Sequence, residues 1–551
     1  MKRALLKKFS IPTITKPLAL FMSGLFVTMR LALDVRDELL GSFKVKRASL
    51  SLIAALVVLI GQGGQALVAE DRVLRIAVEA RPPTYGNPYT QAMPSILHTL
   101  FPVFDALTQL GDNGQVLPNL AESHERLDDL TWRFILRSDV TFANGEPFSA
   151  AAFKRNLDYL LSDEGQATYA SSLIPTVSRV EVEDEFSLLI VTKTRDAILP
   201  RRMSTIVAVA PDAWADLGPS EFGLSPVGTG PYQIVDWGES DGVLDYEAFA
   251  ENWRGAPHIP RVEAYIQAEG VARSQALLSG QIDMAMNAGI DELDYLDSLG
   301  MTIKSVVTPV VGSLAFSNQD PSSPFSDVRV RRAFNYAIDR EGIAKFIFAG
   351  LVEPTGQGTI SGVYGHNPDV ESYPYDPDRA RGLLADAGYQ DGLALSARVT
   401  PGPPVLSILY QKVAQDLAAI GVRLDIQFAQ GPSWVQMWFS GDWKGADLLS
   451  SAWSNTTFMD AARGFETYSC LRPNPFFCEP GITKAIEAVS GEFDADVRLA
   501  LLKDISKRMH DLAPVIYLFP TTNNLVYTSE ITGLEFIGIR AQLESLRFTV
   551  K

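Results

Sequence analysis

Apolar and polar residues alternate along several short segments in the first third of the chain, which is the pattern of half-buried strands. A Gly-Asp-Asn-Gly sequence at 111–114 separates two apolar runs and predicts a turn between two strands. The acidic turn Glu183-Asp184-Glu185 separates two more and predicts a hairpin. The alternating segments are Val73–Val78, Leu130–Leu136, Val177–Val182 and Phe186–Thr192.

A helix is predicted to begin directly after Ser149. Apolar residues recur there at helical spacing, at Phe153, Leu157, Leu160 and Leu161. Serine is a favoured N-cap because its hydroxyl accepts a backbone N–H that the first helical turn leaves unpaired. With the strands around it, this helix makes the first region a mixed α+β structure.

The second half of the chain alternates strands with longer helices. Asp376 caps a predicted helix that has proline at its first position and Gly388 just past its end. Residues 393–399, 405–420 and 422–428 read as strand, helix and strand, which is a βαβ unit. This unit implies a parallel sheet covered by helices. We therefore expect an α/β fold with two lobes and a ligand cleft between them.

Residues 327–338 form another predicted helix, and the segment from Val328 to Arg340 is rich in arginine. One interpretation is an anion site. We favour a solvated face whose charges form surface salt bridges, which is the common role of such side chains. The arginines are Arg329, Arg331, Arg332 and Arg340.

The first 69 residues have the pattern of a cleavable export signal. A basic cluster at 44–47 precedes an apolar run from Ala48 to Ile60, and small and polar residues follow. The apolar run is short for a bilayer span, so we expect cleavage near Glu70 rather than a transmembrane anchor. The segment upstream is unusual for a signal, and Met22 and Met29 are alternative starts. The absence of a nearby cysteine excludes lipid attachment through an N-terminal Cys.

The charge of the chain argues against nucleic acid as a partner. The 551 residues have a formal charge of −17, and the part from Glu70 onward has 38 basic and 62 acidic side chains, a charge of −24. A polyanion is repelled by such a molecule unless a basic face is present. With 46% apolar and 21% charged residues, the composition is that of a folded globular protein.

The two cysteines are Cys470 and Cys478, in a loop rich in proline and aromatic residues. An oxidising compartment would pair them in a disulfide. A reactive dithiol is the alternative, although the spacing is not that of Cys-x-x-Cys. Two cysteines and five histidines leave little material for a zinc or iron–sulfur scaffold, and we expect no metal and no cofactor.

A series of ordered motifs resembles the extracellular solute-binding protein family 5, the dipeptide- and oligopeptide-binding components of ABC importers. The resemblance implies a two-lobed periplasmic-binding-protein fold of the cluster C type, with mixed sheets and an extra α+β subdomain in the first lobe. It covers the chain from Val73 to the C-terminus. The motifs are Phe104–Ser123, Trp132–Arg137, Val140–Ser149, Pro226–Tyr232, Leu277–Asp283, Val328–Arg340 and Tyr375–Tyr389.

The resemblance also implies a domain division and partners. Residues 70–308 with 523–551 are expected to form lobe I, which includes the extra subdomain, and residues 309–522 to form lobe II. The protein would be a monomer, free in the periplasm, that closes on its solute and presents it to a membrane permease. Because the chain contains none of the ATPase machinery, the permease and ATPase are expected on separate chains.

The segment Ala452–Thr457 departs from the pattern of the peptide binders. In those members Gly-Trp-x-x-Asp-Tyr carries a carboxylate that pairs with the α-ammonium of the peptide. Here Trp453 is retained, but Thr456 stands where the acid would be. A neutral hydroxyl does not compensate a buried ammonium, and an unpaired buried charge costs several kcal/mol. The nearest other acid is Asp460, with Arg463 as a partner for a ligand carboxylate or for Asp460 itself.

The predicted ligand-binding residues come from both lobes. A neutral cluster beside Trp453 suits hydroxyl- or amide-rich ligands. Replacing Trp453 with alanine is expected to remove ligand binding and to leave the fold intact. The predicted set is Trp453, Ser454, Asn455, Thr456, Asp460, Arg463 and Trp434, with Asn87, Tyr89 and Met93 from the other lobe.

The sequence therefore predicts an importer component that captures a small solute, with a peptide as the first choice. A sugar, an opine or another hydroxyl-rich solute is the alternative. A secreted hydrolase is the alternative of another class, but no Gly-x-Ser-x-Gly or His-Glu-x-x-His motif is present, and we expect no enzyme. A carrier of a metal or haem complex is a further reading, although the histidines are scattered: His98, His124, His258, His366 and His510.

Overall fold

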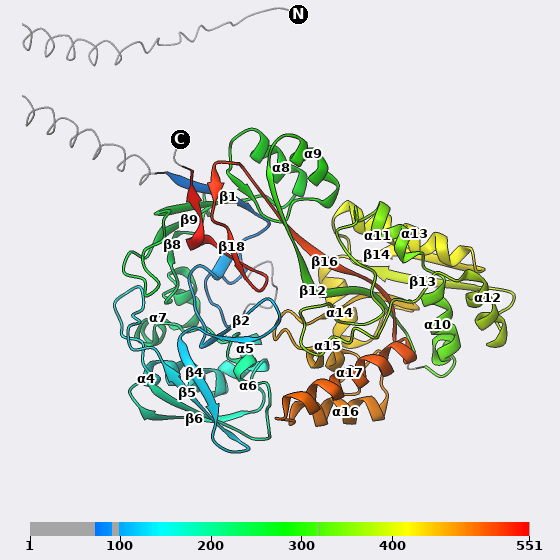
Figure 1. The fold of residues 1–551 in the computed structure, drawn as a ribbon, viewed down its shortest axis with the longest axis horizontal. Coiled ribbons are helices and arrows are strands. Elements are labelled where there is room, and N and C mark those ends of the chain that lie inside the picture. Colours follow the sequence, from blue (N-terminus) through cyan, green and yellow to red (C-terminus); the bar gives the residue numbers. More distant parts are fainter. Residues whose placement is uncertain (1–71, 91–98, 319, 550–551) are drawn as a thin grey trace, which may run out of the picture. The chain divides into compact units, whose positions relative to one another are not determined.

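The computed structural model describes residues 72–90, 99–318 and 320–549. Its largest element is a sheet of ten strands in the order β14-β13-β15-β12-β16-β11-β1-β10-β9-β8 (Figure 1). The strands are β1 (Val73–Val78), β8 (Tyr232–Asp236), β9 (Val243–Ala248), β10 (Arg261–Ile266), β11 (Met284–Ala285), β12 (Thr302–Phe316), β13 (Leu393–Val399), β14 (Val422–Phe428), β15 (Leu448–Ser454) and β16 (Val515–Tyr527).

Two long antiparallel strands, β12 and β16, connect the two halves of this sheet. On one side, β1 and its neighbours pack into hydrophobic clusters that include Leu74, Val262 and Leu296. On the other side, the buried side chains of β13 to β15 belong to separate clusters, which include Val413 and Trp453. Each half of the sheet therefore has its own hydrophobic core.

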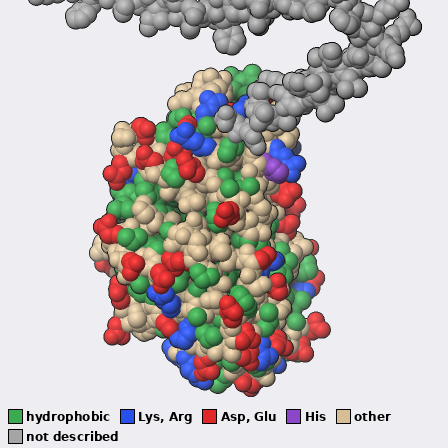
Figure 2. Space-filling view, turned by 90° about the vertical axis from the view of Figure 1, so that its left-hand side faces the viewer, with side chains coloured by type: hydrophobic (Ala, Val, Ile, Leu, Met, Phe, Trp, Pro, Cys, Tyr) green, Lys and Arg blue, Asp and Glu red, His purple; other side chains and the backbone are tan. Residues whose placement is uncertain are grey.

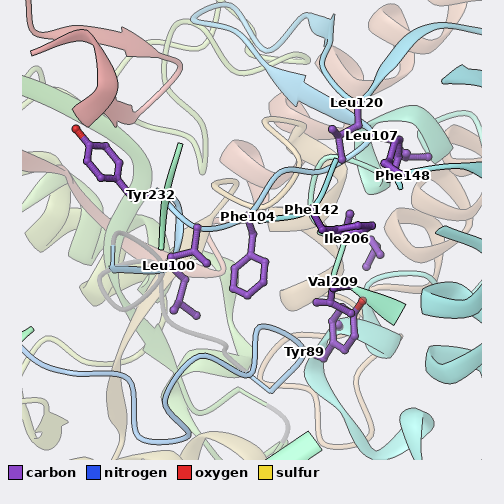
Figure 3. Packing of buried hydrophobic residues seen from close by; sticks show 14 of the residues in the cluster. Tyr89, Leu100, Phe104, Leu107, Leu120, Phe142, Phe148, Ile206, Val209 and Tyr232 are labelled. Carbon is purple, nitrogen blue, oxygen red and sulfur yellow. The ribbon is translucent and has the colours of Figure 1, made fainter. Parts of the chain in front are cut away.

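A second sheet of four strands, in the order β4-β5-β7-β6, forms an α+β unit with helix α4 (Ala150–Leu161). Ser149 caps α4 as predicted, and its side chain accepts from the N–H of Ala152 at 3.2 Å. Figure 3 shows buried apolar side chains of this region, among them Phe142, Phe148 and Ile206, close together. The strands are β4 (Ala121–Arg126), β5 (Thr131–Leu136), β6 (Val177–Asp184) and β7 (Ser187–Thr192).

The remaining helices cover the sheets or connect their strands (Figure 1). They are α5 (Tyr169–Ser172), α6 (Leu199–Arg202), α7 (Pro211–Leu224), α8 (Gly270–Leu278), α9 (Leu293–Ser298), α10 (Val328–Tyr336), α11 (Arg340–Phe346), α12 (Pro377–Asp386), α13 (Pro404–Ala418), α14 (Gly431–Ser440), α15 (Ala461–Thr467), α16 (Pro480–Ser490) and α17 (Ala495–Leu512).

Most elements expected from local patterns are confirmed. The turn at 111–114 joins β2 (Thr108–Leu110) to β3 (Val116–Pro118), which pair antiparallel. Asp376 caps α12 by accepting from the N–H of Arg379 at 2.9 Å. Strands β13 and β14 pair in parallel across α13, so the βαβ unit is present.

The prediction of a solvated arginine face is wrong for two of its four residues. Arg331 and Arg340 are buried, and each donates to main-chain carbonyls, including Phe325 O at 2.7 Å and Tyr517 O at 2.9 Å respectively. Burial lowers the pKa of Arg340 to about 10. These guanidinium groups therefore link α10 and α11 to neighbouring segments. Arg329 is exposed and pairs with Asp327 at 2.6 Å.

The last part of the described chain returns to β1 and its neighbours and forms a short hairpin. Ile537 pairs with Arg540 in this hairpin, and Gly538 lies in the turn between its strands. The N–H of Gly538 donates to Asp112 Oδ1 at 3.0 Å, which ties the turn to the β2–β3 hairpin. The strands here are β17 (Ile531–Thr532), β18 (Glu535–Ile537), β19 (Arg540–Gln542) and β20 (Arg547–Phe548).

Among the described residues, no helix is both long and apolar enough to cross a lipid bilayer. The predicted signal segment, residues 1–69, lies outside the part of the chain that the structure describes. On the face drawn in Figure 2, acidic and basic side chains are interspersed with apolar and uncharged ones, and no continuous basic stripe is visible there.

Candidate functional site

A cavity of about 190 Å³ lies where the loop after β15 meets the first third of the chain and the C-terminal hairpin. This volume is below the roughly 300–1,000 Å³ of typical small-molecule sites, so it suits a small solute or one part of a larger one. The lining residues are Pro88, Leu100, Phe101, Phe104, Ala106, Thr108, Gln109, Leu110, Asn119, Tyr169, Ala170, Leu173, Ser204, Thr205, Val207, Thr456, Thr457, Met459, Ile537, Gly538, Ile539 and Arg540.

The cavity wall combines a large apolar surface with neutral hydrogen-bonding groups. Phe101 and Phe104 supply aromatic rings, and hydroxyl and amide side chains lie among the apolar ones. Thr456 Oγ1 is buried, and it has no hydrogen-bond partner among the described residues. That oxygen is not accessible from the cavity in this conformation, so it can contact a ligand only after a change of the Thr456 side-chain rotamer.

Arg540 is the one charged side chain among the described lining residues. Its guanidinium donates to the carbonyl oxygen of Phe101 and lies 4.7 Å from the centroid of the Phe101 ring. Burial lowers the pKa of Arg540, and the negative charges of Asp105 and Glu544 oppose that effect. An arginine remains charged at neutral pH under such conditions, so the wall carries a fixed positive charge.

Behind this wall lies a buried carboxylate, Asp105, whose charge is already balanced. It pairs with Arg254 and accepts from Thr229 Oγ1 at 3.0 Å and from Trp253 Nε1 at 3.3 Å. Burial opposes the charged form of Asp105, but Arg254 and Arg540 outweigh burial and lower its pKa. Arg540 itself has no carboxylate oxygen within 4.0 Å among the described residues.

Several contacts hold the loop after β15 against the first third of the chain. Arg201 donates to the carbonyl oxygen of Phe458 at 3.1 Å and lies 3.7 Å from Asp460. Phe458 packs against Leu173 and Ile198 in a small hydrophobic cluster. These contacts fix the loop next to the cavity wall, to which Leu173 belongs.

A second contact lies farther out, where Phe493 meets the four-stranded sheet. The guanidinium carbons of Arg126 and Arg195 lie 4.1 and 4.7 Å from the centroid of its ring. Such cation–π contacts contribute about 0.5–1 kcal/mol at exposed sites. The two sides of the cavity are therefore also joined outside its wall.

Beside the cavity lies a more open groove of about 490 Å³, which shares Met459, Gly538 and Ile539 with the cavity wall. Its charged lining residues are Asp112 and Lys304, both exposed, so its formal charges balance. A ligand longer than the cavity can extend from one space into the other past the three shared residues.

Of the predicted binding residues, Thr456 lines the cavity. Trp453 does not: its side chain is 0% exposed, and its ring stacks on that of Tyr468 with a centroid distance of 3.8 Å. The backbone of Gly358 lies directly against the indole. Trp453 is therefore part of the hydrophobic core beneath the loop.

Asp460 is also placed in the interior. Its side chain is completely buried, caps α15 and forms two hydrogen bonds with Arg498, at 2.7 and 3.0 Å. Arg463 pairs instead with Glu466 at 3.0 Å. The interpretation of Arg463 as the partner of Asp460 is wrong, and neither residue lines the cavity.

Three more of the predicted residues do not line the cavity either. Ser454 is exposed, whereas Asn455 is buried and donates to the carbonyl oxygen of Gly358 at 2.7 Å. Trp434 donates to Ser450 O at 3.0 Å and stacks on Trp438.

The predicted segment from the first lobe is near the cavity, but its named side chains are not in the wall. Asn87 and Tyr89 are both buried, and the Tyr89 hydroxyl donates to Val207 O at 3.2 Å. The residue between them, Pro88, lines the cavity. Met93 lies outside the described residues.

Sequence reasoning missed the aromatic and cationic parts of the wall. Phe104 begins one of the motifs that resemble the family, but nothing in the sequence distinguishes it from a core phenylalanine. Arg540 lies more than 80 positions after Thr456 in the chain, so only the returning hairpin brings the two into one wall. The one sequence signal for Arg540 was that it is a basic residue between apolar neighbours in a strongly acidic chain.

The predicted disulfide between Cys470 and Cys478 is present. We expect that replacing both with serine lowers the free energy of unfolding by about 2–3 kcal/mol, because the short closed loop then gains freedom in the unfolded chain. Urea denaturation with and without dithiothreitol measures this effect. The reductant should lower the midpoint of the wild type and leave that of the double variant unchanged; equal midpoints for both proteins without reductant would contradict the prediction.

No group of three or more histidine, cysteine, aspartate or glutamate side chains suited to a metal ion is found within the described part of the chain. His98 lies outside that part. His366 and His510 are partly buried, and burial lowers the pKa of each. His510 Nδ1 lies 2.9 Å from Gly356 O.

These histidines predict a pH dependence of stability. In the unfolded chain a histidine titrates near pH 6.5, so the unfolded state binds more protons than the folded state just below that pH. Stability should therefore fall as the pH is lowered from about 7 to about 5. Thermal unfolding at a series of pH values measures the slope, and a His366→Gln/His510→Gln double variant should show a shallower one. An equal slope for both proteins would contradict this assignment.

Comparison with known proteins identifies relatives that cover most of the chain. The family model of bacterial extracellular solute-binding proteins, family 5 Middle, matches residues 115–473. The glutathione-binding protein GsiB of Salmonella typhimurium is 28% identical over 384 residues, which cover 65% of this chain and 74% of GsiB.

Solved structures of similar fold include the periplasmic binding protein DppA of Helicobacter pylori in complex with the peptide STSA. It is 18% identical, with a TM-score of 0.74, over 87% of this chain and 98% of DppA. The binding protein AgaA of A. tumefaciens R10, in complex with agropinic acid, is 22% identical, with a TM-score of 0.71, over 87% of this chain and 99% of AgaA. The fold is thus that of the two-lobed periplasmic binding proteins, as the motifs implied.

Proposed function

This chain belongs to the bacterial extracellular solute-binding proteins of family 5, and we propose that its solute is a short peptide or peptide derivative, bound in the cavity beside Thr456. Proteins of this family are the solute-binding components of ABC importers, and this chain works with permease and ATPase components. A peptide agrees with the names of two relatives, which bind glutathione and the peptide STSA.

The observation that carries the proposal is the character of the cavity wall. Its described residues include two phenylalanines, hydroxyl and amide groups and a cation, but no carboxylate. Such a wall fits the apolar and amide groups of a peptide. Because the wall has a cation and no carboxylate, it accommodates the carboxylate of a peptide more readily than the ammonium. The small volume favours two or three residues over a long peptide.

A hydroxyl-rich solute of the opine class is the second candidate. The hydroxyl side chains in the cavity wall that favour it are those of Thr108, Ser204, Thr205, Thr456 and Thr457. The first three already donate to main-chain carbonyl oxygens, so they act toward a solute as acceptors. AgaA was solved with agropinic acid, and the binding protein MoaA of the same organism with mannopinic acid. Both proteins share the fold of this chain at 22% identity.

The proposal includes the remaining expectations from the sequence. Residues 1–69 serve as a cleavable export signal, and the mature protein acts free in the periplasm as a monomer. Residues 70–308 with 523–551 form lobe I, and residues 309–522 form lobe II. The chain has no catalytic activity of its own; its relatives are solute-binding proteins.

Thermal-shift measurements on the mature chain test the proposed function. Di- and tripeptides, including glutathione, should raise the melting temperature, because a ligand that binds only the folded state stabilises it. Stabilisation by opines or sugars alone would favour the second candidate. No stabilisation by any of these compounds would contradict both.

A pair of variants tests the place of binding. Thr456→Trp should fill the cavity and abolish the ligand-induced shift, because Thr456 lines the wall. Ser454→Trp adds the same ring two residues earlier, at an exposed position outside the wall, and should keep the shift. Loss of the shift in both variants, or in neither, would contradict binding in this cavity.

A further inference from the structure

The cavity and the adjoining groove differ in their charges, and this difference bears on how a solute lies in them. The cavity wall has Arg540 as its one charged side chain among the described residues. The groove has Asp112 and Lys304, whose formal charges cancel. An anionic group is therefore favoured in the cavity and not particularly in the groove.

Arg540 is held in place by contacts that leave part of its guanidinium available. One Nη atom donates to the carbonyl oxygen of Phe101, and the ring of Phe101 lies under the guanidinium. The group has five N–H donors in a planar fork, a geometry that matches the two oxygens of a carboxylate. The Phe101 contact fixes the orientation of the fork before a ligand arrives, which lowers the entropic cost of binding.

Arg540 forms no direct ion pair with a carboxylate among the described residues. Asp105 is engaged by Arg254, Thr229 and Trp253, and it affects Arg540 only through space. Glu544 acts on Arg540 in the same way. A partly buried cation with no carboxylate oxygen in contact gains more from an anionic ligand than an exposed one does, because water screens it less.

We propose that Arg540 binds a carboxylate of the solute in the cavity, and that the rest of the solute extends past Met459, Gly538 and Ile539 into the groove. This inference rests on the proposed function and adds an orientation to it: the carboxylate end lies inside and the amino end outside. The amino end of a peptide then lies in the open groove, where water solvates its ammonium. The acid absent at position 456 is not needed in this arrangement.

The orientation predicts which chemical changes to a ligand matter. The probes are trialanine, trialanine amide and N-acetyltrialanine, with affinities measured by isothermal titration calorimetry. Amidation should weaken binding to the wild type by roughly 10- to 150-fold, the range for loss of a hydrogen bond to a charged group. Acetylation removes the charge at the solvated end and should change affinity by less than about 3-fold.

Variants of Arg540 separate recognition from a structural role. Arg540→Gln should bind trialanine and its amide with similar affinity, and Arg540→Lys should retain a preference for the carboxylate. The matched control is Arg381→Gln, which removes an exposed arginine of α12 and should keep the full preference. If Arg540 had only a structural role, its replacement would weaken the binding of trialanine and of trialanine amide equally. The ratio of the two affinities would then stay unchanged.

The outcomes distinguish this inference from the proposed function. Equal binding of acid and amide by the wild type, or a preference that persists in Arg540→Gln, would overturn the role of Arg540 while peptide binding stands. A larger loss on acetylation than on amidation would reverse the orientation. No binding of any of the three peptides would contradict the peptide class and, with it, this inference.

Discussion

Replacing Trp453 with alanine should destabilise the protein by about 3–5 kcal/mol, the usual cost of removing a large aromatic side chain from a packed core. The indole is fully buried, stacks on Tyr468 and lies against the backbone of Gly358. Truncation would leave a void that these rigid neighbours do not fill. The sequence led us to expect lost binding with an intact fold; the burial of Trp453 makes lost stability the primary effect.

Urea denaturation without ligand measures this change. The matched control is Trp434→Ala, which removes an indole that is only partly buried and stacks on Trp438 at a centroid distance of 5.1 Å. Its midpoint should fall by less than that of Trp453→Ala. A Trp453→Ala protein that is as stable as the wild type but does not bind solute would place the indole in the binding site and contradict the structure.

The second large effect is expected for Asp460→Asn. This change leaves Arg498 buried without its counter-charge, and loss of one partner of a buried ion pair costs about 3–5 kcal/mol. Asparagine can still cap α15, so the loss is mainly electrostatic. Arg201, 3.7 Å from Asp460, would lose its nearby negative charge as well.

Glu466→Gln is the control from the same helix. It breaks the partly exposed pair with Arg463 and should cost less than about 1 kcal/mol. An Asp460→Asn/Arg498→Met double variant removes both buried charges and should be more stable than the single variant. If Asp460→Asn unfolds at the same urea concentration as Glu466→Gln, the buried pair does not have the role assigned to it.

Features of the fold that depend on neighbours in the chain could be predicted from the sequence. Alternation predicted β1 with the same bounds, and Ser149 and Asp376 cap the helices expected after them. Each of these signals acts over a few residues. The family motifs supplied the two-lobed architecture, which local patterns alone indicate only in outline.

The misplaced residues share a long-range cause. Asp460 and Arg498 are 38 positions apart, and no local rule pairs them. The burial of Arg340 depends on the carbonyl group of Tyr517 in β16, and that of Trp453 on Tyr468 and Gly358. From the sequence alone, a polar or aromatic side chain near an expected cleft is interpreted as a ligand contact. Only the structure shows whether that side chain is already packed against, or paired with, other residues of the protein.

The proposed binding site could be predicted only in part. Thr456 was identified because it departs from a family pattern, and it does line the cavity. Phe101 and Arg540 come from segments far from it in sequence, and no motif marks them. A sequence can thus reveal a change in a family motif, whereas the other groups of the cavity wall must be found in three dimensions.

The most direct test of this account is a crystal structure of the mature protein with the solute that stabilises it most. We predict density for the solute in the cavity bounded by Phe104, Thr456 and Arg540. Density for the solute elsewhere, for example beside Trp434 and Ser454, with the cavity collapsed or filled by side chains, would contradict the central claim.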